Sequence, residues 1–245
     1  MILFDWITDP AILASLVTLT AMEIVLGIDN IVFISVIVAK LPADQAKRAR
    51  QTGLALALVF RVILLSLLFV LIGLTAPLFE VLGHPVSWRD IILFAGGLFL
   101  LVKATSEIHK DVEAAGEDEA SLSAKATASF GAIIAQIVVI DLVFSVDSIV
   151  TAIGMAEYIG VMIAAVVIAV AVMYVASGAV AGFIERHPTT RMLALAFLLM
   201  IGFALVADGA GFHIPRGYLY TAMAFSAVVE ILNVWARRNR QRRRA

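Results

Sequence analysis

The sequence predicts an all-α membrane protein of about seven transmembrane helices, built from an inverted repeat of three plus three helices and one C-terminal helix. Three observations predict this class: an apolar composition, seven long apolar runs, and an internal repeat that carries acidic residues. Of the 245 residues, 62% are hydrophobic, whereas a soluble domain has about 45–50%. The 15% of charged residues gather in short clusters and could not cover the surface of a soluble domain this long.

Seven apolar runs are candidates for membrane spans, because a hydrocarbon core of about 30 Å requires about 20 helical residues. The expected spans are residues 11–39, 52–74, 90–104, 130–156, 161–183, 192–207 and 217–235. The third and sixth are short, although Gly96, Gly97 and Gly202 suit close helix packing in lipid. Because no run sustains an apolar–polar alternation, we expect no strands.

The spans and loops divide one transmembrane domain, residues 1–245, into five parts. We expect a first repeat at 1–104, an acidic cytoplasmic loop at 105–129, a second repeat at 130–210, an extra helix at 211–236 and a basic cytoplasmic tail at 237–245. The acidic loop carries six acids against two lysines. A solvated linker explains this composition more simply than a cation-collecting antechamber does.

Lysine and arginine concentrate after the first, third, fifth and seventh expected spans, which all end on the same side of the membrane. The opposite loops offer only Arg89 and Arg216. Because cytoplasmic loops retain positive charge, we expect the N-terminus outside and the C-terminus in the cytoplasm.

An internal repeat is the most informative feature. The segment EIVLGIDNIV, which starts at Glu23, aligns with DLVFSVDSIV, which starts at Asp141. The alignment pairs Glu23 with Asp141, Gly27 with Ser145, Asp29 with Asp147, and Asn30 with Ser148. Three spans separate the two copies, so the copies enter the membrane with opposite polarity. Inverted repeats of this kind build many secondary transporters, with the substrate near the midplane.

Carboxylates inside membrane spans require a compensating charge. Each costs about 2.5–3.5 kcal/mol at the helix centre, so four would cost about 10–14 kcal/mol if nothing offset them. A divalent cation would offset them, and oxygen ligands suit hard ions such as Mn²⁺, Mg²⁺ or Ca²⁺. Four ionised carboxylates exceed the charge of one such ion, which makes proton exchange a candidate driving force.

The predicted metal ligands come from both copies of the repeat: Glu23, Asp29, Asn30, Asp141, Asp147 and Ser148. On an unbroken helix, Glu23 and Asp29 would lie about 9 Å apart along the axis and about 120° apart around it. Either the helix unwinds near Gly27, or each acid meets a partner in the other copy. We expect Asp29 to face Asp147 across a pseudo-twofold axis, with Glu23 and Asp141 forming a second layer or completing the first.

Other polar residues in the spans have simpler explanations beside functional ones. Arg61 either pairs with one of the acids when the site is empty, or forms a structural ion pair or snorkels to the inner face. Gln136, Glu230 and Asn233 are expected to form interhelical hydrogen bonds, and Asp208 to be a solvated loop aspartate. The chain has no cysteine.

Several separate motifs resemble the TerC family of integral membrane proteins. They are GIDN, VFSVDS, GGLFLLVKATSEIHK at residues 96–110 and FHIPRGYLYTAMAFS at residues 212–226. The resemblance implies a seven-helix bacterial inner-membrane protein whose relatives include manganese exporters and proteins named for tellurium resistance. It places the family's acidic motifs on the six residues proposed as ligands. Longer relatives carry appended cytoplasmic domains that are not visible here, so we expect the short form.

We therefore expect a secondary transporter that exports a divalent cation, with Mn²⁺ as the substrate that the resemblance implies. The alternatives are a non-transporting membrane scaffold of a metal or tellurium stress-resistance complex, and a transporter of Ca²⁺ or another ion. The expected partners are the lipid bilayer, the metal ion and protons, without nucleic acid and without a cofactor. Because GxxxxGK and GxSxG motifs are absent from the sequence, we expect no ATP-driven pumping and no hydrolase activity.

Overall fold

The fold is a bundle of long helices, as the composition predicts. A computed structural model describes residues 9–39, 41–81, 83–113, 130–153 and 158–242. In these ranges seven helices are long and apolar enough to cross a membrane. They are α1 (Pro10–Val38), α2 (Ala43–Ser66), α4 (Trp88–Glu113), α6 (Phe130–Ile153), α7 (Ile159–Arg186), α8 (Pro188–Gly209) and α9 (Arg216–Arg242). The seven expected spans and the all-α membrane class are confirmed.

The third and sixth spans are longer than the sequence suggested. Helix α4 has 26 residues and α8 has 22. The apolar run of α4 ends before its last turns, because these turns contain charged residues such as Glu107 and Lys110. Helix α4 thereby extends into the expected acidic loop as far as Glu113, and residues 114–129 of that loop lie outside the described ranges.

The expectation of no strands is wrong between the second and third spans. Helix α2 ends at Ser66, and a short helix α3 (Leu68–Gly73) precedes an antiparallel hairpin of β1 (Pro77–Val81) and β2 (His84–Ser87). At the turn, Gly83 has a φ of 80°, a conformation that glycine adopts without strain. Strands of five and four residues are too short to establish an alternating pattern.

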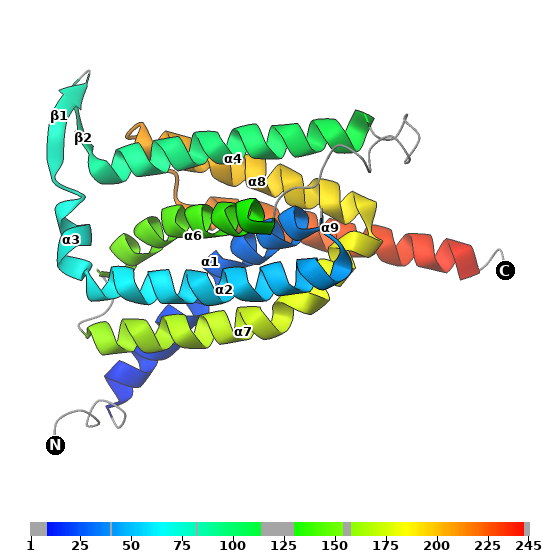
Figure 1. Ribbon diagram of the computed structural model, residues 1–245, viewed down its shortest axis with the longest axis horizontal. Helices are drawn as coiled ribbons and strands as arrows, with labels where there is room; N and C mark the ends of the chain where they lie inside the picture. The colour runs from blue at the N-terminus through cyan, green and yellow to red at the C-terminus, as the bar shows by residue number, and fades with distance from the viewer. Residues whose placement is uncertain (1–8, 40, 82, 114–129, 154–157, 243–245) are drawn as a thin grey trace.

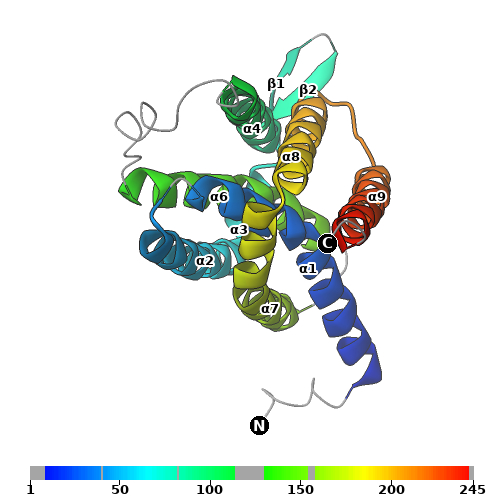
Figure 2. The same ribbon diagram turned by 90° about the vertical axis from the view of Figure 1, so that its right-hand side faces the viewer.

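Helices from different parts of the sequence form the closest pairs. Helix α4 packs along α8, α1 along α7, and α2 along α6. Figure 1 shows α4 and α8 lying side by side along the length of the bundle, and Figure 2 shows α9 at its rim. Helix α1 begins and α9 ends at opposite ends of the molecule (Figure 1). The hairpin and the first turns of α4 lie at the end where α1 begins.

Small residues bring helix backbones together, as expected for packing in lipid. A Cβ on Gly97 of α4 would lie 2.6 Å from the carbonyl oxygen of Gly202 in α8, so the two backbones leave no space for a side chain. Gly27 does not break the helix, which was one of the two expected alternatives. Helix α1 is continuous there, and a Cβ on Gly27 would collide with the side chain of Met173 in α7. The predicted alternative of an unwound helix near Gly27 is therefore not what the structure adopts.

Replacement of Gly97 by Ala tests the α4–α8 contact. The new methyl group would meet the Gly202 oxygen and the Val206 nitrogen, which are backbone atoms and cannot rotate away. We expect a loss of about 1–3 kcal/mol of stability, measured as a lower thermal unfolding midpoint of the purified protein. Gly217→Ala is the control, because no heavy atom lies within 4 Å of its added Cβ. Equal midpoints for the two variants would contradict the close contact.

Candidate functional site

A buried arginine joins three helices near the middle of the bundle. Arg61 of α2 is 2% exposed. Its Nη1 donates to Glu23 Oε2 of α1 at 2.7 Å, and its Nη2 donates to Asp141 Oδ1 of α6 at 2.8 Å. Its Nε donates to Ser145 Oγ at 3.0 Å. Both carboxylates are almost fully buried, so this ion-pair network lies away from solvent.

Helical spacing explains why these side chains meet. Residues seven apart return to nearly the same face of an α-helix, because each residue advances by about 100°. Glu23 and Asn30 therefore share one face of α1, and Asp141 and Ser148 share one face of α6. Asn30 Nδ2 donates to Asp141 Oδ1 at 3.0 Å, which connects the two faces directly.

A small polar cavity adjoins this network. It has a volume of about 20 Å³, which is room for about one water-sized molecule. Its lining includes Asn30, Arg61, Asp147 and Ser148. The side-chain oxygen Oδ1 of Asn30 is buried and has no hydrogen-bond partner among the residues that the structure describes. Buried acceptors are normally satisfied, so this amide oxygen is available to a water molecule or a ligand in the cavity.

Asp147 belongs to a second ion-pair cluster, at the end of the bundle where α4 and α9 begin. Its Oδ1 accepts from Arg89 Nη2 at 2.6 Å, and its Oδ2 accepts from Arg216 Nη2 at 2.5 Å. Arg216 also contacts Asp208 Oδ2 at 3.2 Å. Asp208 is 6% exposed and accepts from the backbone N–H of Ile214, so the expectation of a solvated loop aspartate is wrong.

The structure therefore divides the predicted ligands into two groups. Glu23, Asn30 and Asp141 come together around Arg61, whereas Asp147 contacts Arg89 and Arg216. The backbone of Asp29 lies in α1, but its side chain lies outside the described residues. Among the described side chains, no group of three histidines or acids is placed to hold a metal ion.

In the sequence, Arg89 and Arg216 indicate only the expected orientation of the chain. Their position carried a further signal, because they are the basic residues of the expected outer loops, next to spans that contain acids. Arginines are uncommon on the side of the membrane that is poor in positive charge, so their presence there indicates a specific role, such as pairing with a buried acid.

A larger, open cavity of about 590 Å³ lies between α1 and α9. Five side chains line both this vestibule and the small cavity: Leu26, Asp147, Ser148, Arg216 and Tyr220. The Asp147–Arg216 ion pair thus stands between the open vestibule and the space beside Asn30 and Arg61.

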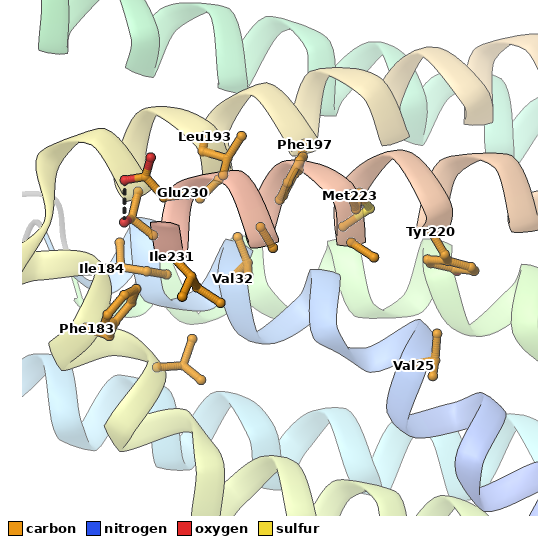
Figure 3. Close-up of a pocket in the computed structure, with 15 residues that line it drawn as sticks. Val25, Val32, Phe183, Ile184, Leu193, Phe197, Tyr220, Met223, Glu230 and Ile231 are labelled. Carbon is orange, nitrogen blue, oxygen red and sulfur yellow. Dashed lines mark hydrogen bonds between the residues drawn. The ribbon is translucent and has the colours of Figure 1, made fainter. Parts of the chain in front are cut away.

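An apolar groove of about 480 Å³ is lined by α1, α7, α8 and α9 (Figure 3), and it shares Tyr220 with both polar cavities. Its acidic residue is Glu230, whose Oε1 accepts from the hydroxyl groups of Thr189 and Thr190 in α8. This confirms Glu230 as an interhelical hydrogen-bonding residue. Because the rest of the lining is apolar apart from a threonine and a tyrosine, the groove offers a cation few ligands.

Comparison with known protein families identifies the family of this chain. Residues 8–245 match the model of the integral membrane protein TerC family. The chain belongs to the TerC family. It is a multi-pass membrane protein, and its relatives include proteins named as inner membrane proteins.

Relatives of this TerC chain in Escherichia coli (strain K12) differ in length. The UPF0053 inner membrane protein YoaE is 51% identical over 235 residues, which cover 96% of this chain and 45% of YoaE. The UPF0053 inner membrane protein YgdQ is 49% identical over 232 residues, which cover 95% of this chain and 96% of YgdQ. The chain thus spans less than half of YoaE and almost all of YgdQ. No solved structure matches it.

The ion pairs of Asp147 in this TerC protein can be tested with a cysteine probe, because the chain has no cysteine of its own. Ser148→Cys places a thiol on the lining that the vestibule and the small cavity share. We expect Arg216→Gln to increase several-fold the rate at which this thiol reacts with a membrane-impermeant maleimide applied from the side where α4 and α9 begin. Removing the arginine breaks the ion pair that separates the two cavities.

The matched control is Arg191→Gln, which removes an arginine paired at 3.0 Å with Asp111 on α4, away from these cavities. It should leave the labelling rate unchanged. An unchanged rate in the Arg216 variant would show that this ion pair does not limit access to Ser148.

Proposed function

We propose that this chain is a secondary transporter that exports a divalent metal cation, with Mn²⁺ as its substrate. The observation that carries the proposal is the pair of buried carboxylates, Glu23 and Asp141, that share one cationic group inside a membrane bundle. Carboxylate, amide and hydroxyl oxygens converge there from the two copies of the repeat. This donor set suits a hard divalent ion.

The charges of this network favour a cation as substrate. Two ionised carboxylates and one guanidinium leave a formal charge of −1, which attracts a cation and repels an anion in a low-dielectric interior. The unpaired Asn30 oxygen beside the small cavity adds a neutral ligand of the kind that Mn²⁺ and Ca²⁺ accept. Asp29, Asp147 and Ser148 complete the proposed ligand set.

Helix packing supports an inverted-repeat mechanism. In the proposed repeat, α1 corresponds to α6, α2 to α7, and α4 to α8. Exchanging the two halves converts the α1–α7 pair into the α6–α2 pair and leaves the α4–α8 pair unchanged, and these are the three pairs of helices with the most extensive contacts. Such symmetry suits alternating access around a central site.

The choice of Mn²⁺, the export direction and the cytoplasmic C-terminus rest on the TerC resemblance and on the distribution of lysine and arginine. Ligand type alone does not separate Mn²⁺ from Ca²⁺, because selectivity depends on cavity size and coordination number.

A scaffold without transport activity is the second candidate. The observation that favours it is that Arg61 connects α1, α2 and α6, so the charged residues also hold the bundle together. A chain of this kind would move no Mn²⁺ in proteoliposomes, and the replacement of its carboxylates would affect only its folding and assembly.

Replacement of both carboxylates by their amides separates the two candidates. We expect the Glu23→Gln, Asp141→Asn double variant to insert and fold but to lose Mn²⁺ movement in proteoliposomes by at least about 100-fold, because the loss of both charges removes several kcal/mol of attraction for a divalent ion. Glu230→Gln is the matched control, an amide replacement inside the bundle away from the polar cavities. Metal movement that survives in the folded double variant would exclude transport by these carboxylates.

Proton exchange is tested by an imposed pH gradient. The proposed ligand set contains four carboxylates against one divalent ion, so we expect the rate and direction of Mn²⁺ movement in proteoliposomes to follow the gradient. Vesicles that carry the Glu23, Asp141 double variant provide the baseline. Metal movement by the unmodified chain that ignores the gradient would exclude proton coupling and leave the metal site itself intact.

A further inference from the structure

We propose that Arg61 is a built-in counter-cation: its guanidinium occupies the carboxylate site when no metal is bound and leaves that site when the metal enters. The inference rests on the proposed function, since it assigns the mechanism by which the same site is kept neutralised between transport cycles.

The side chain of Arg61 lies within the carboxylate site and does not extend to the membrane surface. Each of its three nitrogens donates to a side chain of the network, to Glu23, Asp141 or Ser145. With 2% of its surface exposed, the side chain does not snorkel to either face of the bilayer. Its position is therefore determined by the acids.

The metal and the guanidinium require the same oxygens. Glu23 Oε2 and Asp141 Oδ1 are the carboxylate oxygens that face the centre of the network, and Arg61 contacts both within 2.8 Å. A divalent ion bound between the same two oxygens would lie within contact distance of the guanidinium charge. Like charges at that separation in a low-dielectric interior repel strongly, so the two cations exclude each other.

The buried oxygen of Asn30 is a further acceptor beside the network. It lies next to the small cavity, where a bound cation could use it as a neutral ligand. Here Arg61 satisfies both carboxylates, while Asn30 Oδ1 has no partner in the described part of the chain. The guanidinium thus replaces the charge of a bound cation without replacing all its contacts.

A further acid lies near Arg61, at the lining of the small cavity. Arg61 and Asp147 both line this cavity. Asp147, which also contacts Arg89 and Arg216, provides an acid of the correct charge near the guanidinium when the metal occupies Glu23 and Asp141. The arginine can then leave the site without becoming an isolated buried charge.

Measurement of Mn²⁺ binding to the purified full chain tests the inference. Arg61→Gln removes the competing charge and keeps a polar side chain, so we expect Mn²⁺ to bind at least about tenfold more tightly than to the unmodified chain, by titration calorimetry or by the Mn²⁺ paramagnetic resonance signal. Transport should slow in proteoliposomes, because the metal has no competitor to expel it. A structural arginine predicts the opposite change in affinity.

Two further variants keep the test decisive. Arg61→Lys retains the positive charge but not the three-nitrogen contact, and we expect a metal affinity between those of the unmodified chain and the glutamine variant. Arg50→Gln removes another arginine of α2 outside the network and should leave the affinity unchanged. If the glutamine variant fails to fold, the lysine variant provides the measurement.

The outcomes separate this inference from the proposed function. Equal or weaker Mn²⁺ binding by a folded Arg61 variant, with normal transport by the unmodified chain, would overturn the counter-cation and leave the transporter intact. Absence of Mn²⁺ binding and of Mn²⁺ movement in every variant and in the unmodified chain would overturn the proposed function, and the inference with it.

Discussion

The structure depends on the neutralisation of acidic groups away from water. Glu23 and Asp141 lie inside a bundle whose surroundings are apolar, where an uncompensated carboxylate would be strongly destabilising. One guanidinium contacts both, and its third nitrogen binds Ser145. Because these contacts come from α1, α2 and α6, the requirement for charge balance also determines how the three helices sit against one another.

The remaining helices provide a frame for this polar centre. The α4–α8 pair is packed so closely that its backbones touch at Gly97 and Gly202, which leaves little freedom for one helix to move against the other. The ion pairs of Arg61 lie instead between α1, α2 and α6. A division between a tightly packed pair and a polar, ion-paired centre is what a transporter needs if some helices move and others do not.

Much of this organisation could be predicted from the sequence. Apolar length determined the seven spans, and the repeated acids at Glu23 and Asp141 identified side chains that do come together. The partners of Asp147 could not be predicted, because contact with Arg89 and Arg216 depends on how the ends of α4 and α9 approach α6. The short hairpin also had no signal, since its strands are shorter than the window in which alternation can be recognised.

The alignment favoured Asp29 and Asp147 as the first ligands, whereas Glu23 and Asp141 form the central network. Helical geometry explains why Asp147 lies apart from that network. Asp141 and Ser148 share the face of α6 that meets α1, whereas Asp147 is rotated by about 120° from Asp141. Spacing on the helix was therefore a better guide to the central network than similarity between the two copies was.

The arginines that hold Asp147 each have a second acid within reach. Arg216 contacts Asp208 at 3.2 Å, and Arg89 lies 3.8 Å from Asp90. If Asp147 separates from one of these arginines, that arginine therefore still has an acid beside it. This lowers the energetic cost of the separation, because no unpaired charge is left in an apolar environment. Because these ion pairs share partners, the contacts of Asp147 could break and form again without unfolding the helices that carry them.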